Sequence, residues 1–362
     1  MQLDLTSDQE FFRDTTARYL DERAPVGELR RLRDDPAGYD EKFWTGGAEL
    51  GWTSLLVDEA HGGGTISGDG LVDLTLVAYE FGRHAAPGPL IPTNLVAAAL
   101  SATGAAGDVL ADLLAGDAVA SWVAPGGQTR IDVRADGDDV VVDGVARPAE
   151  SAAEATHVLV GADDDTHVLV PTDAPGVTVE PMSTVDLTRR FSLVRFDGVR
   201  LPASSLLRGV DVERQLQVAA VLACAESVGA MQAGFDMTVE WAFDRYSFGR
   251  PLASYQEIKH RFADMKTWLE ASHAISDAAA VAVSRRSHDA AQLVSAAKAY
   301  VGEFGTELLQ DCVQIHGGIG VTYEHDLHLY LRRHTVDRSL YGTPSDHRQR
   351  IADLVEQEEA RQ

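Results

Sequence analysis

The chain has 362 residues, 45% of them hydrophobic and 24% charged, which is an ordinary globular composition. Against 31 Lys and Arg stand 56 Asp and Glu, so the formal net charge is −25 and we expect no general nucleic-acid or anionic-membrane partner. The two cysteines, Cys224 and Cys312, lie in apolar contexts without CxxC spacing, which predicts buried thiols in a reducing compartment and no disulfide or zinc site.

Neither residues 1–8 nor the apolar stretches of the chain predict export or membrane insertion. Residues 1–8 are polar and acidic, so no signal peptide is visible. No uninterrupted apolar stretch approaches the ~20 residues that a membrane helix needs. We therefore expect a cytoplasmic protein.

The first part of the chain, residues 1–118, is predicted to be an α-helical domain. Thr6 and Gln9 have the spacing of a capping box, which starts a helix. Residues at helical spacing then form its buried face: Phe12, Thr16, Tyr19, Leu20. Further helices follow between Gly- and Pro-rich breaks, with Ala and Leu dominating residues 90–114.

Residues 119–201 are predicted to form a β domain. The stretch 130–134 alternates between polar and apolar residues, and Asp136-Gly137 is a hairpin-turn dipeptide. Short β-rich runs separated by turn residues continue the pattern: 140–142, 157–160, 167–170, 191–196. The order is thus helices, a β insert and then helices again.

The last part, residues 202–362, is predicted to form long helices. A continuous apolar stripe runs along one of them: Leu293, Ala297, Val301, Phe304, Leu308, Cys312, Ile315. Helices of this length around one core favour a bundle, so the whole chain is of the α+β class.

One candidate binding segment runs from Arg245 to Pro251 and is followed by Gln256. Glycine and proline after a long helix make a tight turn, from which an arginine, a hydroxyl and an amide project. That set of groups suits an anionic or pyrophosphate ligand. The alternative is a plain helix end with a solvated arginine.

A second candidate segment runs from Gln314 to Gly320 and contains Gly317 and Gly318. Its glycines end the preceding helix and allow a ligand to approach the backbone, although such glycines are also common as simple C-caps. His316 is expected to be packed or solvated. The histidines that follow lack the spacing of a zinc site, and no metal is expected: His325, His328, His334, His347.

Taken together, the two segments resemble the acyl-CoA dehydrogenase family, in which an Arg–x–x–Phe–Gly turn and a Gln–x–x–Gly–Gly loop hold FAD. Glu80-Phe81-Gly82-Arg83 and the exit from the β domain at 199–202 add to the resemblance. It implies an N-terminal helical domain, a middle β-barrel or sandwich and a C-terminal four-helix bundle. It also implies a set of FAD-binding residues: Arg245, Ser247, Phe248, Gln256, Gln314, Gly317, Gly318.

The family's chemistry needs a carboxylate base that removes the α-proton of a CoA thioester, while flavin N5 accepts the β-hydride. Alignment of the two segments with the family places Tyr341 and Ala219 at its two base positions. A phenol, with a reference pKa of ~10, is a poor base at neutral pH. Glu213 could serve only through a shifted alignment. Glu226, on an apolar helix, is expected to be a buried structural or interface acid.

The residues that pack beside the flavin ring in the family are also missing. Residues 123–128 lack the family's Thr-Glu pair, and Pro148-Ala149-Glu150 stands where a Trp-Ile-Thr segment is expected. The resemblance therefore implies a chain without catalytic residues, which gives the clamp for the adenosine and pyrophosphate half of FAD to a homologous catalytic subunit. Such α2β2 complexes oxidise CoA esters with bulky steroid or side-chain acyl groups, and the family commonly passes electrons to an electron-transfer flavoprotein.

Two other interpretations of the chain's function stay open. The chain could be a homomeric flavoenzyme with Tyr341 or Glu213 as an unusual base. It could also be a flavin-free structural subunit. Retention of Arg245 and Gln314 at the family's positions argues against the second of these.

Overall fold

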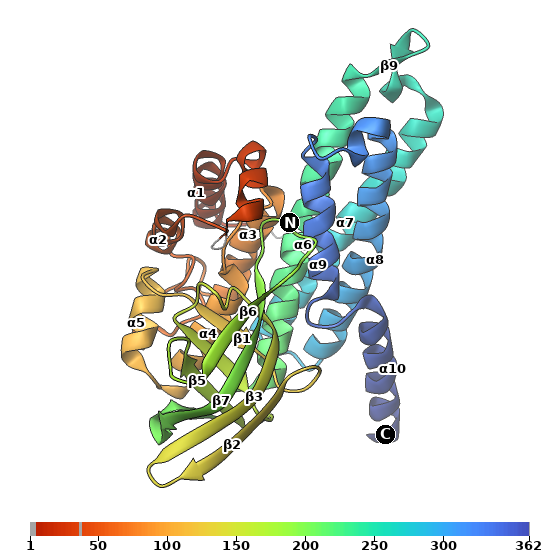
Figure 1. The fold of residues 1–362 in the computed structure, drawn as a ribbon. Coiled ribbons are helices and arrows are strands. Elements are labelled where there is room, and N and C mark those ends of the chain that lie inside the picture. Colours follow the sequence, from red (N-terminus) through yellow and green to blue (C-terminus); the bar gives the residue numbers. More distant parts are fainter. Residues whose placement is uncertain (1–4, 36–37, 362) are drawn as a thin grey trace. The chain divides into compact units, whose positions relative to one another are not determined.

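The computed structural model describes residues 5–35 and 38–361 (Figure 1). The first half of the polar stretch 1–8 lies outside the described residues. The first helix, α1 (Ser7–Arg23), begins with the predicted capping box, because Gln9 N donates to Thr6 Oγ1 at 3.2 Å and Thr6 N donates to Gln9 Oε1 at 3.1 Å. Phe12, Thr16 and Leu20 are buried, as predicted, whereas Tyr19 is only half-buried.

The chain divides into two compact units. One comprises the described residues up to Leu29, the segment Leu71–Ala86 and the chain from Ala220 onward; the other comprises Arg30–Gly70 and Pro87–Ala219. The second unit contains three α-helices and all the strands from β1 to β8. Its helices are α2 (Glu41–Glu49), α4 (Leu90–Thr103) and α5 (Gly107–Ala115).

Two four-stranded sheets form the β part of that unit, in the orders β1-β4-β5-β8 and β2-β3-β7-β6. The strands are β1 (Ala120–Val123), β2 (Arg130–Asp136), β3 (Asp139–Glu150), β4 (His157–Gly161), β5 (Thr166–Pro171), β6 (Val177–Met182), β7 (Phe191–Pro202) and β8 (Leu206–Arg208). Small and branched side chains from both sheets, such as Val142, Val160 and Val194, share one buried core. The two sheets therefore pack face to face.

The predicted hairpin at Asp136-Gly137 joins β2 to β3, with Asp136 paired to Asp139 across the turn and Gly137 at φ +67°. β8 differs from the helix expected directly after residue 202, because this strand pairs with β5 before the next helix begins at Val212. Three residues are too short for a periodic pattern, so only the pairing with β5 reveals the strand.

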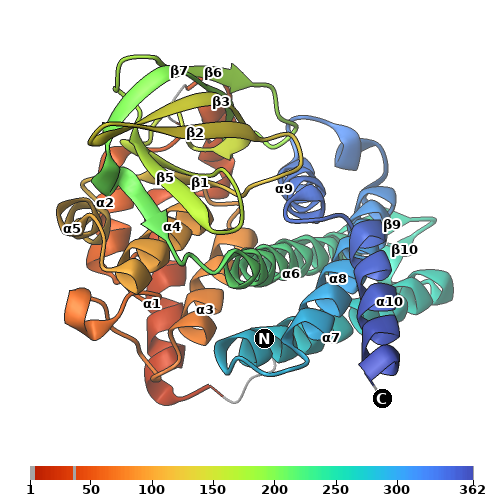
Figure 2. The same cartoon turned by 90° about the horizontal axis from the view of Figure 1, so that it is seen from below.

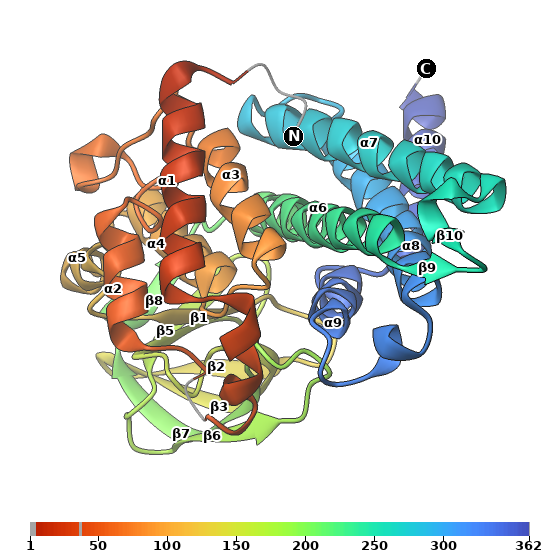
Figure 3. The same ribbon diagram turned by 90° about the horizontal axis from the view of Figure 1, so that it is seen from above.

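The other unit is helical. It contains α1, α3 (Gly70–Arg83), most of α6 (Val212–Asp244), α7 (Gln256–Ser284), α8 (Ala290–His316), α9 (Leu327–Ser339) and α10 (Pro344–Arg361). Helix α6 lies among α3, α7, α8 and α9 (Figures 2 and 3). It is long and apolar enough to cross a membrane, yet 83% of its most apolar stretch is buried inside the protein, as in a core helix.

Helices α3 and α6 cross with their backbones in contact. A Cβ on Gly82 would lie 1.8 Å from Glu226 O, and a Cβ on Gly229 would lie 2.0 Å from Tyr79 O. Only glycine fits at these two positions, because any side chain would push the helices apart. The crossing thus sets where the polar residues of α3 lie relative to those of α6.

Candidate functional site

The turn that follows α6 is a tight hairpin formed by β9 (Tyr246–Ser247) and β10 (Arg250–Pro251). Phe248 and Gly249 at its tip have positive φ, +49° and +80°. Leu252 N donates to Arg245 O at 2.8 Å, and Tyr255 Oη donates to Ser247 O at 2.7 Å. These two hydrogen bonds close the turn and leave the Arg245 side chain exposed.

The second segment ends α8 at His316 and continues as the 3-10 helix η5 (Gly317–Val321). Gly317 has φ +67°, which L side chains rarely adopt. A Cβ on Gly317 or Gly318 would meet no atom within 4 Å. The backbone of this loop therefore faces open space, and a ligand can approach it closely.

A stack of aromatic rings joins the two segments. Trp241, one helical turn before Arg245, lies parallel to His316 with ring centroids 5.3 Å apart, and Arg245 Cζ lies 6.0 Å from the Trp241 ring centroid. His316 is buried, its Nδ1 donates to Cys312 O at 2.8 Å, and burial lowers the pKa of its imidazole. His316 is thus packed, as expected, and the turn and the loop lie at one end of the helical unit.

We call the residues at this end that the resemblance predicts to bind FAD the clamp: Arg245, Ser247, Phe248, Gln256, Gln314, Gly317, Gly318. Arg245, Gln256 and Gln314 are exposed, and Ser247 is half-buried. In the part of the chain that the structure describes, no hydrogen bond joins Arg245 to Gln314. The Trp241–His316 stack brings the arginine turn and the glycine loop to one region, where Gln256 Nε2 lies 3.5 Å from His260 Nε2.

A group of large apolar side chains surrounds the clamp, and sequence reasoning found only Phe248 among them. Phe248 is 98% exposed at the hairpin tip. The other members are exposed within these two segments or within three residues of them: Phe243, Tyr246, Ile319, Val321, Tyr323. We call this group the clamp-end patch. Several exposed aromatic residues in one region are typical of a surface that another molecule covers.

Two family models match the chain that carries these two segments. The model described as acyl-CoA dehydrogenase, N-terminal domain, matches residues 6–107, and the C-terminal domain model matches residues 209–355. Together they cover more than half of the chain. The chain belongs to the acyl-CoA dehydrogenase family.

Curated relatives and solved structures agree with the family. Acyl-CoA dehydrogenase IpdE2 of Mycolicibacterium smegmatis is 28% identical over 96% of this chain and 98% of its own length. The structure titled "Tcur3481-Tcur3483 steroid ACAD G363A variant" is 26% identical, with a TM-score of 0.87 over 97% of this chain and 98% of that one. The ChsE4-ChsE5 complex of Mycobacterium tuberculosis shares the fold at 22% identity, with a TM-score of 0.89 over 98% and 99% of the two chains. The acyl-CoA dehydrogenase fold expected from the sequence is confirmed.

The two positions at which the acyl-CoA dehydrogenase resemblance places a base hold no carboxylate. Ala219 is fully buried in α6. Tyr341, in the turn before α10, has φ +58°. Its carbonyl accepts a hydrogen bond from His347 Nε2 at 3.0 Å, and the neighbouring Leu340 carbonyl accepts one from Lys298 Nζ at 2.7 Å. The backbone of this turn is therefore held from both sides.

The remaining candidate acids of this chain have other partners. Glu213 is exposed in the first turn of α6 and accepts a hydrogen bond from Gln217 Nε2 at 2.6 Å. Glu226 is buried and forms an ion pair with Arg333, which also donates to Ala86 O at 2.8 Å. A carboxylate so enclosed has a structural role, which agrees with the expectation for Glu226.

The β segment aligned with the ring-side residues of the acyl-CoA dehydrogenase family is filled by an internal ion pair. Glu150 is buried and receives two parallel hydrogen bonds from Arg189, at 2.7 Å from Nε and 2.8 Å from Nη2. Such a two-point pair holds both side chains in place. The Glu150 carboxylate is therefore already engaged within this chain.

Proposed function

We propose that this chain is a non-catalytic subunit of a FAD-dependent acyl-CoA dehydrogenase. In this proposal it forms an α2β2 complex with a homologous catalytic subunit. The observation that carries it is the clamp, which keeps its exposed Arg245, Gln314 and glycines in a chain whose two base positions hold Tyr341 and Ala219.

The clamp fits the adenosine and pyrophosphate half of FAD. Arg245 would supply positive charge to the diphosphate, and the backbone at Gly317 and Gly318 is open to close approach. Ser247, Phe248, Gln256 and Gln314 complete the set of side chains at this end. FAD supplies the hydride acceptor for α,β-desaturation of a CoA thioester. The clamp-end patch supports a partner that would cover this surface and hold the rest of the flavin.

Removal of the α-proton would belong to the partner. Ala219 has no group that accepts a proton, and the Tyr341 phenol has a reference pKa of ~10. The Glu150–Arg189 ion pair likewise leaves no free carboxylate in the segment aligned with the ring side. This chain would then bind and orient the cofactor, and the catalytic subunit would perform the chemistry.

The relatives support a bulky acyl-CoA as substrate. The structure described as the Tcur3481-Tcur3483 steroid ACAD is 26% identical to this chain, and its description pairs two protein names, Tcur3481 and Tcur3483. We therefore propose a steroid or side-chain CoA ester, with an electron-transfer flavoprotein as the electron acceptor and the cytoplasm as the location.

The test is the visible absorbance spectrum of the purified chain, alone and after co-expression with the homologous dehydrogenase encoded nearest to it. A colourless chain that becomes part of a yellow complex, with one flavin for each pair of unlike subunits, is the expected result. Arg245→Ala should empty the complex of FAD while leaving assembly intact. Arg195→Ala, at an exposed ion pair in the β part of the chain, is the matched control.

Two outcomes would contradict the proposal. A yellow chain on its own, bleached by an acyl-CoA, would mean a homomeric flavoenzyme in which Tyr341 or Glu213 is the base. A complex that stays colourless would mean a flavin-free structural subunit.

A further inference from the structure

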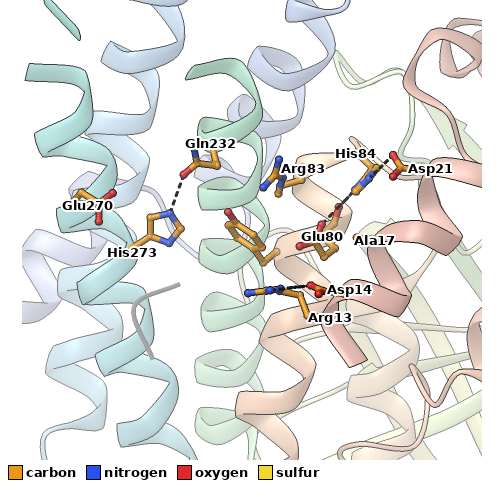
Figure 4. A pocket seen from close by; sticks show the side chains of 11 residues that line it. Arg13, Asp14, Ala17, Asp21, Glu80, Arg83, His84, Gln232, Glu270 and His273 are labelled. Atoms are coloured by element: carbon orange, nitrogen blue, oxygen red, sulfur yellow. Dashed lines mark hydrogen bonds and ion pairs between the residues drawn. The ribbon is translucent and has the colours of Figure 1, made fainter. Parts of the chain in front are cut away.

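The helical unit has a cavity, partly open to solvent, that contains none of the clamp residues. It has a volume of about 560 Å³ and lies between α1, α3, α6 and α7 (Figure 4). That volume is in the range of small-molecule sites. The lining is polar: Arg13, Asp14, Ala17, Asp21, Tyr79, Glu80, Arg83, His84, Gln232, Glu270, His273.

Most charges around this cavity are already paired. Arg13 Nη2 lies 2.8 Å from Asp14 Oδ1, and Arg83 Nη2 lies 3.6 Å from Asp236 Oδ2. His84 faces an oxygen at both ring nitrogens, because Nδ1 lies 2.8 Å from Glu80 O and Nε2 lies 3.1 Å from Asp21 Oδ1.

Glu80 is the lining carboxylate that these pairs leave unsatisfied. Its side chain is only 6% exposed, and His84 Nδ1 lies 3.7 Å from its Oε2. The hydrogen on that nitrogen points instead to the Glu80 main-chain carbonyl. Among the described residues, no donor makes a hydrogen bond to the Glu80 carboxylate. A buried carboxylate without hydrogen bonds is costly, and burial raises its pKa despite the opposing effects of Arg83 and His84.

Aromatic side chains form the neighbouring wall. The rings of Tyr79 and His273 lie 5.6 Å apart, and both residues are buried. Burial lowers the pKa of His273 to about 3, so this imidazole is neutral at physiological pH. The Gly82–Gly229 crossing holds α3 against α6, which keeps Tyr79 and Glu80 in place beside Gln232. The Gln232 amide is already engaged, because its Nε2 donates to Asp236 Oδ1 at 2.7 Å and its Oε1 lies 3.4 Å from His273 Nε2, so the wall offers a cation chiefly an aromatic ring.

We propose that this cavity is a binding site for a small organic cation, a guanidinium or primary ammonium compound that donates hydrogen bonds to the Glu80 carboxylate and lies against the Tyr79 ring. Glu270, which also lines the cavity, is paired with Lys266, so it does not compete with Glu80 for the cation. The chain's net charge of −25 favours the approach of a cation from solution.

Isothermal titration calorimetry on the full chain at low ionic strength tests this proposal. The probes are n-butylguanidine, which is a cation, and n-butylurea, which has almost the same shape and no charge. We expect saturable binding of the guanidine and at least about tenfold weaker binding of the urea, because a charge-assisted hydrogen bond to a buried acid is lost. Glu80→Gln should weaken guanidine binding by a similar factor.

Glu303→Gln is the matched control, because it removes the same charge from α8, where Glu303 pairs with Arg348. It should bind the guanidine as the unchanged chain does. A melting curve of each variant shows that it folds, and Glu80→Gln changes almost no volume. The proposal is wrong if the guanidine does not saturate the unchanged chain, if the urea binds as tightly, or if Glu80→Gln has no effect on binding. Neither probe reports on flavin, so the result is independent of the proposed function.

Discussion

Trp241 in α6 and His316 at the end of α8 stack face to face, with ring centroids 5.3 Å apart and ring planes inclined by 16°. Each residue lies within one helical turn of a segment assigned to the clamp. Trp241 precedes Arg245, whose guanidinium lies over the indole, and His316 directly precedes Gly317. The stack therefore places the arginine turn and the glycine loop relative to each other.

Replacing Trp241 by Ala should weaken FAD retention by the assembled complex by about tenfold. Loss of an aromatic pair is worth ~0.5–1.5 kcal/mol beyond buried area, and Arg245 loses the ring beneath it. Trp241→Phe should retain most of the flavin. The measurement is the flavin absorbance of the purified complex after dialysis. Trp268→Ala, which removes a ring packed on Phe304 in the same unit, is the control, and equal loss from both variants would refute the role of the stack.

Tyr341→Phe should change turnover of an acyl-CoA by the assembled complex less than about twofold. The phenol is a weak base at neutral pH, and the turn is held through main-chain carbonyls that this change leaves intact. Steady-state rates with and without the change test this. A hundredfold loss of kcat would show that the Tyr341 hydroxyl takes part in the chemistry.

Glu226→Gln should lower the free energy of unfolding by about 3–5 kcal/mol, because it leaves the Arg333 guanidinium buried without its counter-charge. Glu180→Gln gives the comparison, since Glu180 pairs with Arg195 at the surface and such pairs contribute ~0–1 kcal/mol. Urea unfolding of the two variants measures the difference. Equal small losses would mean that the buried pair does not stabilise the helical unit.

Stability should fall as the pH drops below about 6.5, in part because of His334. This side chain is fully buried between Ser227 and Thr306, and burial lowers its pKa to about 4. The unfolded chain takes up this proton near the ordinary histidine pKa, whereas the folded chain does so only near pH 4. The stability that the neutral His334 side chain contributes is therefore complete above about pH 6.5. It is lost progressively between about pH 6.5 and about pH 4, and the free energy of unfolding falls by up to ~1.4 kcal/mol per pH unit.

Urea unfolding across that pH window, with the unchanged chain and with His334→Gln, isolates this contribution. The variant should show a shallower slope, and His347, whose pKa burial also lowers to about 4, accounts for part of the slope that remains. Parallel curves for the two proteins would contradict the assignment.

Much of the fold could be predicted from the sequence, because its signals are local. The capping box at Thr6 and Gln9, the hairpin dipeptide at Asp136-Gly137 and the apolar stripe of α8 each depend on residues a few positions apart. The family resemblance, which the domain models confirm, likewise depends on short motifs with characteristic spacing. The roles of Arg245, Gln314 and the other clamp residues remain predictions from those motifs.

Only the tertiary structure decided which distant residues meet. The Trp241–His316 stack, the Glu226–Arg333 pair and the cavity around Glu80 all join helices that are far apart in the chain. Short-range periodicity shows which face of a helix is apolar, but not which neighbour covers it. That choice is made by packing, as where Gly82 and Gly229 allow α3 and α6 to touch and so determine which polar side chains are enclosed together.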